Sequence, residues 1–247
     1  MAGGIFHPDF RAEPYWWLAA PPEDASTVPL PAAADVVIVG SGFAGLSAAL
    51  EAARGGASVL VVDGGPLGGG ASSRSGGMVS SGQKLVLSEA LRDLPAEKAQ
   101  AALEDSKATF EFLKDLVSRE QLDCDLALTG RFFGAFAPSH FEILKRNAET
   151  LAARTGVTIR LLSRAEQREE VASDYFHGGF VVEDYGGLHP AKLNAALRVA
   201  ARNAGAVLAS HARVSKVARM GEGQRVETTR GAVAAKRVLF ATNGYTD

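Results

Sequence analysis

A glycine-rich turn between an apolar run and an amphipathic segment is the feature that most constrains the fold of this chain. The turn reads G-x-G-x-x-G, and its glycines are Gly40, Gly42 and Gly45. Residues 35–39 have the continuous apolar pattern of a parallel strand covered on both faces, and residues 44–54 have the apolar spacing of a helix. A second β-branched run follows at 58–62. Strand, helix and strand in this order predict a right-handed βαβ unit.

The spacing of the three glycines suits the binding of a dinucleotide. Gly40 permits the tight turn, Gly42 leaves room for a pyrophosphate, and Gly45 lets the helix pack closely on the strand. The N-terminus of the helix offers N–H donors and the positive end of its dipole to the phosphates. Asp63, at the end of the second strand, can accept hydrogen bonds from both ribose hydroxyls and disfavours the 2′-phosphate of NADP. Glycines that served only a tight turn would leave Asp63 unexplained.

Composition and charge exclude several classes of function. The net charge of −2 gives no field that would favour nucleic acid or an anionic membrane surface. The single cysteine, Cys124, excludes an intrachain disulfide and a thiolate metal site, so we expect no metal. The first residues do not have the pattern of a signal peptide, and no apolar run approaches the roughly 20 residues that cross a bilayer. We expect a soluble, cytoplasmic protein.

The rest of the chain predicts two further kinds of structure around the βαβ unit. Residues 1–33 hold six of the ten prolines and should form an extended arm without helix or sheet. Its apolar cluster 15–18 is either a patch that docks the arm on the body or a lid at the mouth of a pocket. The glycine- and serine-rich segment 64–82 is either a flexible linker or backbone that passes close to a ligand; its position after the second strand favours the latter.

Helices are expected at 96–120, 138–155 and 190–204, from their apolar periodicity and the prolines near their starts. Three short alternating runs between 212 and 237 predict a β-meander, and a separate buried strand should follow from 237. Strands are also expected around 131, 159, 180 and 207. His189, at the start of the third helix, is expected to be a helix-start residue and not a catalytic base.

Five ordered segments resemble the FAD-dependent oxidoreductases of the D-amino-acid oxidase type, most closely the bacterial γ-glutamylputrescine oxidase-like branch. They are YWW at 15–17, ADVVIVGSGFAGLSAAL at 34–50, GASSRSGGMVSSG at 70–82, GGLHPAKLNAAL at 186–197 and LFATNGYTD at 239–247. The resemblance implies an α/β fold: a Rossmann-like, glutathione-reductase-type FAD-binding domain with a β-meander, and an inserted, incomplete α+β substrate domain. The expected divisions are an arm at 1–33, an FAD-binding domain at 34–95 and 186–247, and the insertion at 96–185.

The resemblance also assigns roles to particular residues. FAD is expected to bind non-covalently, because the segment 64–82 contains no histidine to which flavin could be attached. Arg131 is a candidate partner for a substrate carboxylate, the alternative being a surface arginine. The residues expected to contact FAD are Gly40, Gly42, Phe43, Ala44, Gly45, Asp63, Ser72, Ser73, Arg74, Gly76, Gly77, Val214, Ala241, Asn243 and Gly244.

The chemistry implied by the resemblance is oxidation of the CH–NH bond of an amine or amino acid. A hydride passes to flavin N5, the imine hydrolyses, and oxygen or another acceptor reoxidises the flavin. The substrate stays open among γ-glutamylputrescine-like conjugates, D-amino acids, glycine and N-methyl amino acids, and no residue is assigned a catalytic role. Family members run beyond ATNGYTD, so we expect a fragment that binds FAD weakly and turns over poorly. The alternatives are a catalytically silent flavin-binding module and an NAD-linked dehydrogenase.

Overall fold

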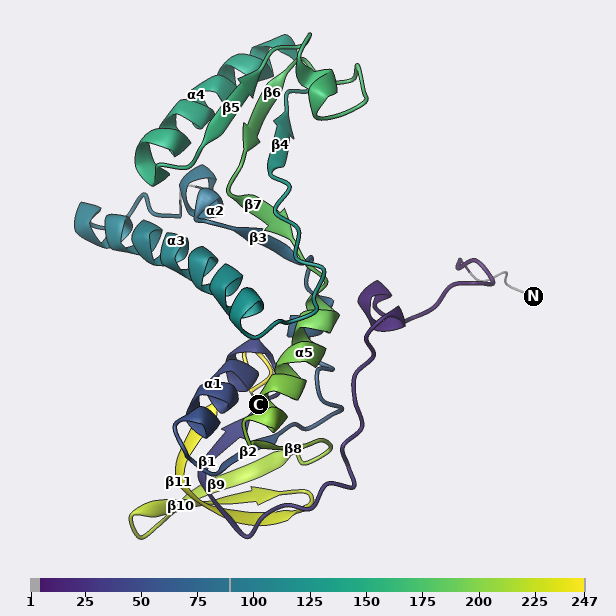
Figure 1. Ribbon diagram of the computed structural model, residues 1–247, viewed down its shortest axis with the longest axis vertical. Coiled ribbons are helices and arrows are strands. Elements are labelled where there is room, and N and C mark those ends of the chain that lie inside the picture. Colours follow the sequence, from purple (N-terminus) through teal and green to yellow (C-terminus); the bar gives the residue numbers. More distant parts are fainter. Residues whose placement is uncertain (1–4, 89, 247) are drawn as a thin grey trace. The chain divides into compact units, whose positions relative to one another are not determined.

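The computed structural model describes residues 5–88 and 90–246, which form two compact units (Figure 1). Unit 1 combines the chain up to Gly76 with the chain from His189 onward, and unit 2 comprises Gly77–Leu188. The described residues of 77–95 and residues 186–188 therefore belong to unit 2, whereas the sequence predicts them in the FAD-binding domain. The outer ends of the expected arm and of the second FAD-binding segment, 1–4 and 247, lie outside the described residues.

Unit 1 is built on a six-stranded sheet with the order β8-β2-β1-β11-β10-β9. The expected βαβ unit is present as β1 (Ala33–Val39), α1 (Phe43–Arg54) and β2 (Val59–Val62), and β1 pairs parallel with β2. Helix α5 (Pro190–Asn203) leads into β8 (Val207–Ala209), which extends the parallel part beside β2. Helices α1 and α5 pack side by side (Figure 1).

The meander and the last strand are joined differently from the expectation. β9 (Val214–Met220) and β10 (Gly223–Thr228) are followed by one strand, β11 (Gly231–Phe240), which pairs antiparallel with β10 and parallel with β1. The charged residues Lys236 and Arg237 suggest that one strand ends and another begins there. Both side chains are exposed, however, so β11 continues through them without a break. The expected burial of the last strand is also wrong, because Leu239 is 40% and Phe240 57% exposed.

Burial on both faces of the parallel strands explains their continuous apolar sequence. Every residue of β2 is buried, and Val37, Ile38 and Val39 are buried in β1. The expected apolar face of α1 is confirmed by its buried residues Leu46, Ala49, Leu50 and Ala53. Within the described residues, no helix has both the length and the apolar character that a membrane crossing needs.

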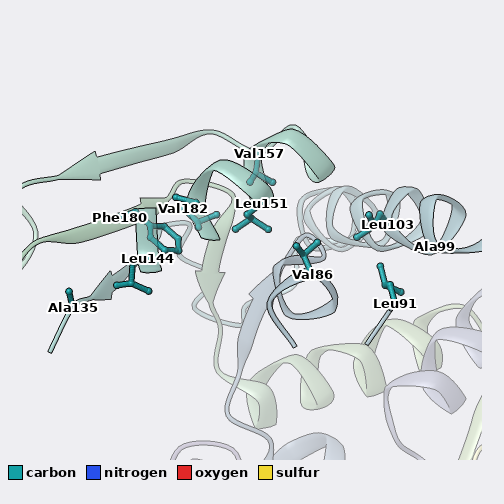
Figure 2. Close-up of a cluster of buried hydrophobic side chains, with 11 residues drawn as sticks. Val86, Leu91, Ala99, Leu103, Ala135, Leu144, Leu151, Val157, Phe180 and Val182 are labelled. Atoms are coloured by element: carbon teal, nitrogen blue, oxygen red, sulfur yellow. The ribbon is translucent and has the colours of Figure 1, made fainter. Parts of the chain in front are cut away.

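Unit 2 combines three helices with two small antiparallel sheets. Its helices are α2 (Gln83–Leu87), α3 (Ala96–Arg119) and α4 (Pro138–Thr155). Its sheets have the orders β4-β6-β5 and β3-β7, formed by β4 (Arg131–Gly134), β6 (Gly179–Val182), β5 (Ile159–Leu162), β3 (Met78–Ser80) and β7 (Tyr185–Gly187). Figure 2 shows the core of this unit, where Leu144 and Leu151 of α4 gather with Phe180 and Val182 of β6.

Short 3-10 turns occur within segments for which the sequence predicts no regular structure. The arm contains η1 (Tyr15–Leu18), so the expectation of no helix there is wrong by one turn, and the glycine-rich segment contains η2 (Ala71–Arg74). A third turn, η3 (Gln167–Glu169), precedes β6. The arm also pairs with the glycine-rich segment, because the backbones of Glu23 and Leu67 exchange two hydrogen bonds. The part of the arm around Glu23 is therefore packed against the glycine-rich segment.

Candidate dinucleotide-binding site

Close backbone contacts surround the glycine turn at the carboxyl end of β1. A Cβ on Gly45 would lie 2.0 Å from the carbonyl oxygen of Gly40, and a Cβ on Gly40 would lie 2.6 Å from that of Ala241. Gly40 also has φ +109°, which side-chain-bearing residues rarely adopt. Two of the three expected glycine roles, the tight turn and close helix packing, thus have a geometric basis. A Cβ on Gly42 would lie 3.0 Å from Ser72 Oγ, at the start of α1.

The Asp63 carboxylate points to the residue in the middle of this turn. Its Oδ2 accepts hydrogen bonds from the Ser41 N–H (2.9 Å) and the Ser41 hydroxyl (2.6 Å). Its Oδ1 accepts one from the Gly65 N–H at 3.1 Å. Since a carboxylate can accept about four hydrogen bonds, about one position is left for a ligand hydroxyl. Asp63 is therefore where the sequence places it, but direct bonds to both ribose hydroxyls would require one of these contacts to yield.

Two polar residues that the sequence analysis did not single out connect the site. Ser41 is 1% exposed, and its hydroxyl accepts a hydrogen bond from Gly68 N–H at 3.0 Å while donating to Asp63. Asn194 of α5, also 1% exposed, donates from its amide to the carbonyl oxygen of Ser41 at 3.0 Å. Asn194 lies far from the turn in the chain, so only the packing of α5 against α1 brings it here. The one sequence signal for Asn194 is that a polar residue stands at an inward-facing position of an amphipathic helix.

The 3-10 turn η2 brings the expected serine and arginine residues to the same region. Ser72 Oγ accepts a hydrogen bond from Phe43 N–H, the first residue of α1, at 3.1 Å. Ser73 is buried and donates to the Gly68 carbonyl at 2.5 Å. Arg74 is exposed and donates to the Tyr245 hydroxyl at 3.2 Å. The η2 part of the glycine-rich segment is therefore held by hydrogen bonds, which argues against a flexible linker, and its placement beside a ligand stays a prediction.

The remaining expected cofactor residues are spread around this end of the sheet. The Ala241 N–H donates to the Val39 carbonyl at 2.8 Å, which places the end of β11 beside the glycine turn. Asn243 has φ +53° in the turn that follows, and Gly244 is exposed. Val214 starts β9 close to Asp63, because the Ala212 N–H donates to the Asp63 carbonyl at 2.7 Å.

Three of the expected residues, Ala44, Gly76 and Gly77, lie outside the hydrogen-bonded core of the site. Ala44 is an exposed residue in the first turn of α1. Gly76 ends unit 1 and Gly77 begins unit 2. All the predicted cofactor residues except Gly77 therefore belong to unit 1, in the segments that follow β1, β2 and β11 or at the start of β9.

Arg131, the candidate substrate residue, lies in unit 2 on β4. Its guanidinium donates to the Tyr185 hydroxyl at 2.6 Å and lies 4.6 Å from the ring centre of Phe133 and 5.1 Å from that of Tyr185. Met78, which is 67% exposed, contacts the same hydroxyl through its sulfur at 3.3 Å. Arg131 is thus an exposed but ordered cation held by two aromatic rings.

The geometry of unit 1 fits the adenosine diphosphate half of a dinucleotide. The N-cap residue of α1 is Gly42, which has no side chain of its own, so the Ser72 hydroxyl approaches the first turn and bonds the Phe43 N–H. Anions bind at such helix starts through free N–H groups. The half-buried Asp63 carboxylate lies at the adjacent strand end, where its remaining acceptor position could take a sugar hydroxyl. His189 caps α5 by accepting from Lys192 N–H at 3.2 Å, as expected for a helix-start residue.

Comparisons with known proteins agree with this geometry. The family model described as FAD dependent oxidoreductase (DAO) matches residues 35–247. The probable oxidoreductase OrdL of Rhizobium meliloti is 30% identical over 93% of this chain, and the gamma-glutamylputrescine oxidoreductase of Escherichia coli is 29% identical over 85%. The chain spans 54% and 49% of their lengths. The crystal structure of glycine oxidase from Geobacillus kaustophilus superposes with a TM-score of 0.67 at 26% identity, covering 85% of this chain and 55% of that one.

Proposed function

Because the chain belongs to the DAO family of FAD dependent oxidoreductases, we propose that it binds FAD non-covalently and oxidises the CH–NH bond of an amine or amino acid. The observation that carries this proposal is the Asp63 carboxylate, which lies against Ser41 in the glycine turn, next to the start of α1. When bound, FAD supplies the acceptor for the hydride that leaves the carbon next to the amine nitrogen. Water then hydrolyses the oxidised substrate to a carbonyl compound and ammonia or an amine.

The residues of unit 1 divide the binding of FAD among themselves. The start of α1 and the backbone at Gly42 hold the pyrophosphate, and Asp63 holds the adenosine ribose. We assign to Arg74, an exposed cation on the glycine-rich segment, contact with a phosphate or the electron-rich ring of the flavin. The backbone of Val214 is proposed to bond the adenine, since β9 begins beside the strand end that carries Asp63.

We assign recognition of a substrate carboxylate to Arg131. Stacking on Phe133 and the hydrogen bond to Tyr185 fix the guanidinium plane, and a fixed guanidinium suits the two oxygens of a carboxylate. The nearby Met78 side chain offers an apolar contact. This arrangement favours amino acids and carboxylate-bearing amine conjugates over simple amines.

Anaerobic mixing tests the proposed function. The FAD-loaded chain would be mixed separately with glycine, sarcosine, D-amino acids and γ-glutamylputrescine without oxygen, while the visible absorbance of oxidised flavin is recorded. Bleaching by at least one of these compounds is expected, and Arg131→Gln should raise the substrate concentration that gives half of the maximal bleaching rate about tenfold or more. FAD that binds but is bleached by none of them would favour the silent flavin-binding module. Retention of NAD instead of FAD would favour the NAD-linked dehydrogenase.

A further inference from the structure

The aromatic cluster in the arm has a specific place in unit 1 that the proposed function does not use. Tyr15 and Leu18 are exposed, whereas Trp16 and Trp17 are half-buried. The Trp16 ring meets His189 edge-on with 4.8 Å between ring centres. The Trp17 indole N–H donates to Ser73 Oγ at 2.9 Å, and its ring lies 5.8 Å from the Arg74 guanidinium. The two tryptophans therefore dock the arm on different elements.

Trp17 contacts a turn that connects three parts of unit 1. Successive residues of η2 bond different partners, since Ser72 bonds the start of α1, Ser73 bonds the arm, and Arg74 bonds Tyr245 after β11. Ser73 is 3% exposed, so its hydroxyl has little access to water as an alternative partner. The bond from Trp17 therefore holds the turn at the residue next to Ser72.

Further contacts fix the arm against the same segment. Glu23 forms ion pairs with Arg198 and Arg202 of α5, and Arg198 also donates to the Leu67 carbonyl at 3.0 Å. Arg198 is 5% exposed, so this cation depends on these partners for stabilisation. The backbone bonds between Glu23 and Leu67 continue the contact to the start of the glycine-rich segment. The arm thus contacts this segment at both Leu67 and η2.

We propose that Trp17 is a positioning residue for FAD binding, which fixes Ser72 at the start of α1 through its bond to Ser73. This inference rests on the proposed function. The ligand affected is the pyrophosphate of FAD, because Ser72 Oγ lies 3.0 Å from the position of a Cβ on Gly42, beside the phosphate-binding backbone. Trp17 itself is not assigned any contact with FAD.

Titration of FAD into the full 247-residue chain tests this role. Trp17→Phe keeps most of the ring and removes the donor, and it should raise the Kd for FAD about five- to tenfold, the usual effect of one lost hydrogen bond. Trp16→Phe is the matched control, since it is the neighbouring indole on the same turn but contacts His189, and its Kd should stay within about twofold of wild type. The two Kd values are measured well below the thermal unfolding midpoint of each variant.

A double-mutant cycle of Trp17 and Ser73, read out as the Kd for FAD, distinguishes the positioning role of Trp17 from a merely structural one. Ser73→Ala should raise the Kd at least as much as Trp17→Phe, because it removes the bond from Trp17 together with the Ser73 bond to the Gly68 carbonyl. The double variant should bind FAD no more weakly than Ser73→Ala alone, because the Trp17 bond is already absent in that variant. Equal Kd values for Trp17→Phe and Trp16→Phe, or fully additive effects of Trp17→Phe and Ser73→Ala, would overturn the role of Trp17 while leaving FAD binding intact. A wild-type chain that binds no FAD would overturn the proposed function and this inference together. If Trp17→Phe does not fold, a Kd for Ser73→Ala within about twofold of wild type would overturn the role of Trp17, because this variant also lacks the Trp17 bond, and a Kd raised about fivefold or more would support it.

Discussion

At the scale of single residues, the site depends on positions where no side chain fits. The Gly45 Cα and the Gly40 carbonyl are so close that a methyl group on Gly45 would overlap the backbone. Asp63, by contrast, works through its side chain and through Ser41, whose hydroxyl relays the contact to Gly68. A side chain added at Gly45 should therefore lower the stability of the fold. Loss of the Asp63 carboxylate should instead weaken the binding of FAD.

Gly45→Ala should lower the free energy of unfolding by about 2 to 3 kcal/mol, because the new Cβ would lie 2.0 Å from the Gly40 carbonyl oxygen and α1 would have to shift. Gly55→Ala is the matched control at the other end of the same helix, where the nearest atom would be at an ordinary 3.4 Å. Urea unfolding of both variants gives the comparison, and the control should change by about 0.5 kcal/mol or less. Similar midpoints for the two variants would contradict the close packing described for α1.

At the scale of elements, a polar cluster joins the central strands near the starts of β1 and β2, away from the candidate site. The Asp35 carboxylate of β1 accepts from Lys236 Nζ of β11 at 2.6 Å, and from the backbone N–H and hydroxyl of Ser58 before β2 at 2.8 and 2.7 Å. The Lys236 contact, followed by those of Ser58, holds the pKa of Asp35 well below its ordinary value of 3.8. Three strands are thus linked by one ionised group.

This link gives stability a defined dependence on pH. Because the folded pKa of Asp35 lies below the unfolded value of 3.8, its contribution is complete above that value and is lost as the pH falls below it. Asp35→Asn should therefore be less stable than wild type at pH 7, and the difference should narrow from about pH 5 down to about pH 3. Chemical unfolding across this range measures it. A difference between the two proteins that does not change with pH would show that the ionised carboxylate adds nothing.

At the scale of the whole molecule, the sequence predicts local elements well and long-range polar contacts poorly. The bounds of α4 follow from Pro138 and from the Gly156 C-cap, and the βαβ unit follows from its glycine spacing. The continuity of β11 could not be predicted, because two adjacent charged residues, Lys236 and Arg237, are typical of a turn. Only the pairing of β11 with β10 on one edge and β1 on the other shows that a single strand runs through them. Similarly, nothing local shows that Asn194 reaches Ser41, since that contact requires α5 to pack on α1.

Calorimetric titration of FAD into the wild-type chain and into Asp63→Asn tests the proposed cofactor site most directly. This variant keeps the shape of the side chain and can still accept from Ser41, but it loses the charge and one acceptor oxygen. We predict one FAD per wild-type chain and a Kd at least about tenfold higher for Asp63→Asn, as expected for hydrogen bonds to a charged group. Equal affinity in the two proteins, or no binding by wild type, would contradict the claim that unit 1 holds the adenosine diphosphate of FAD at the glycine turn.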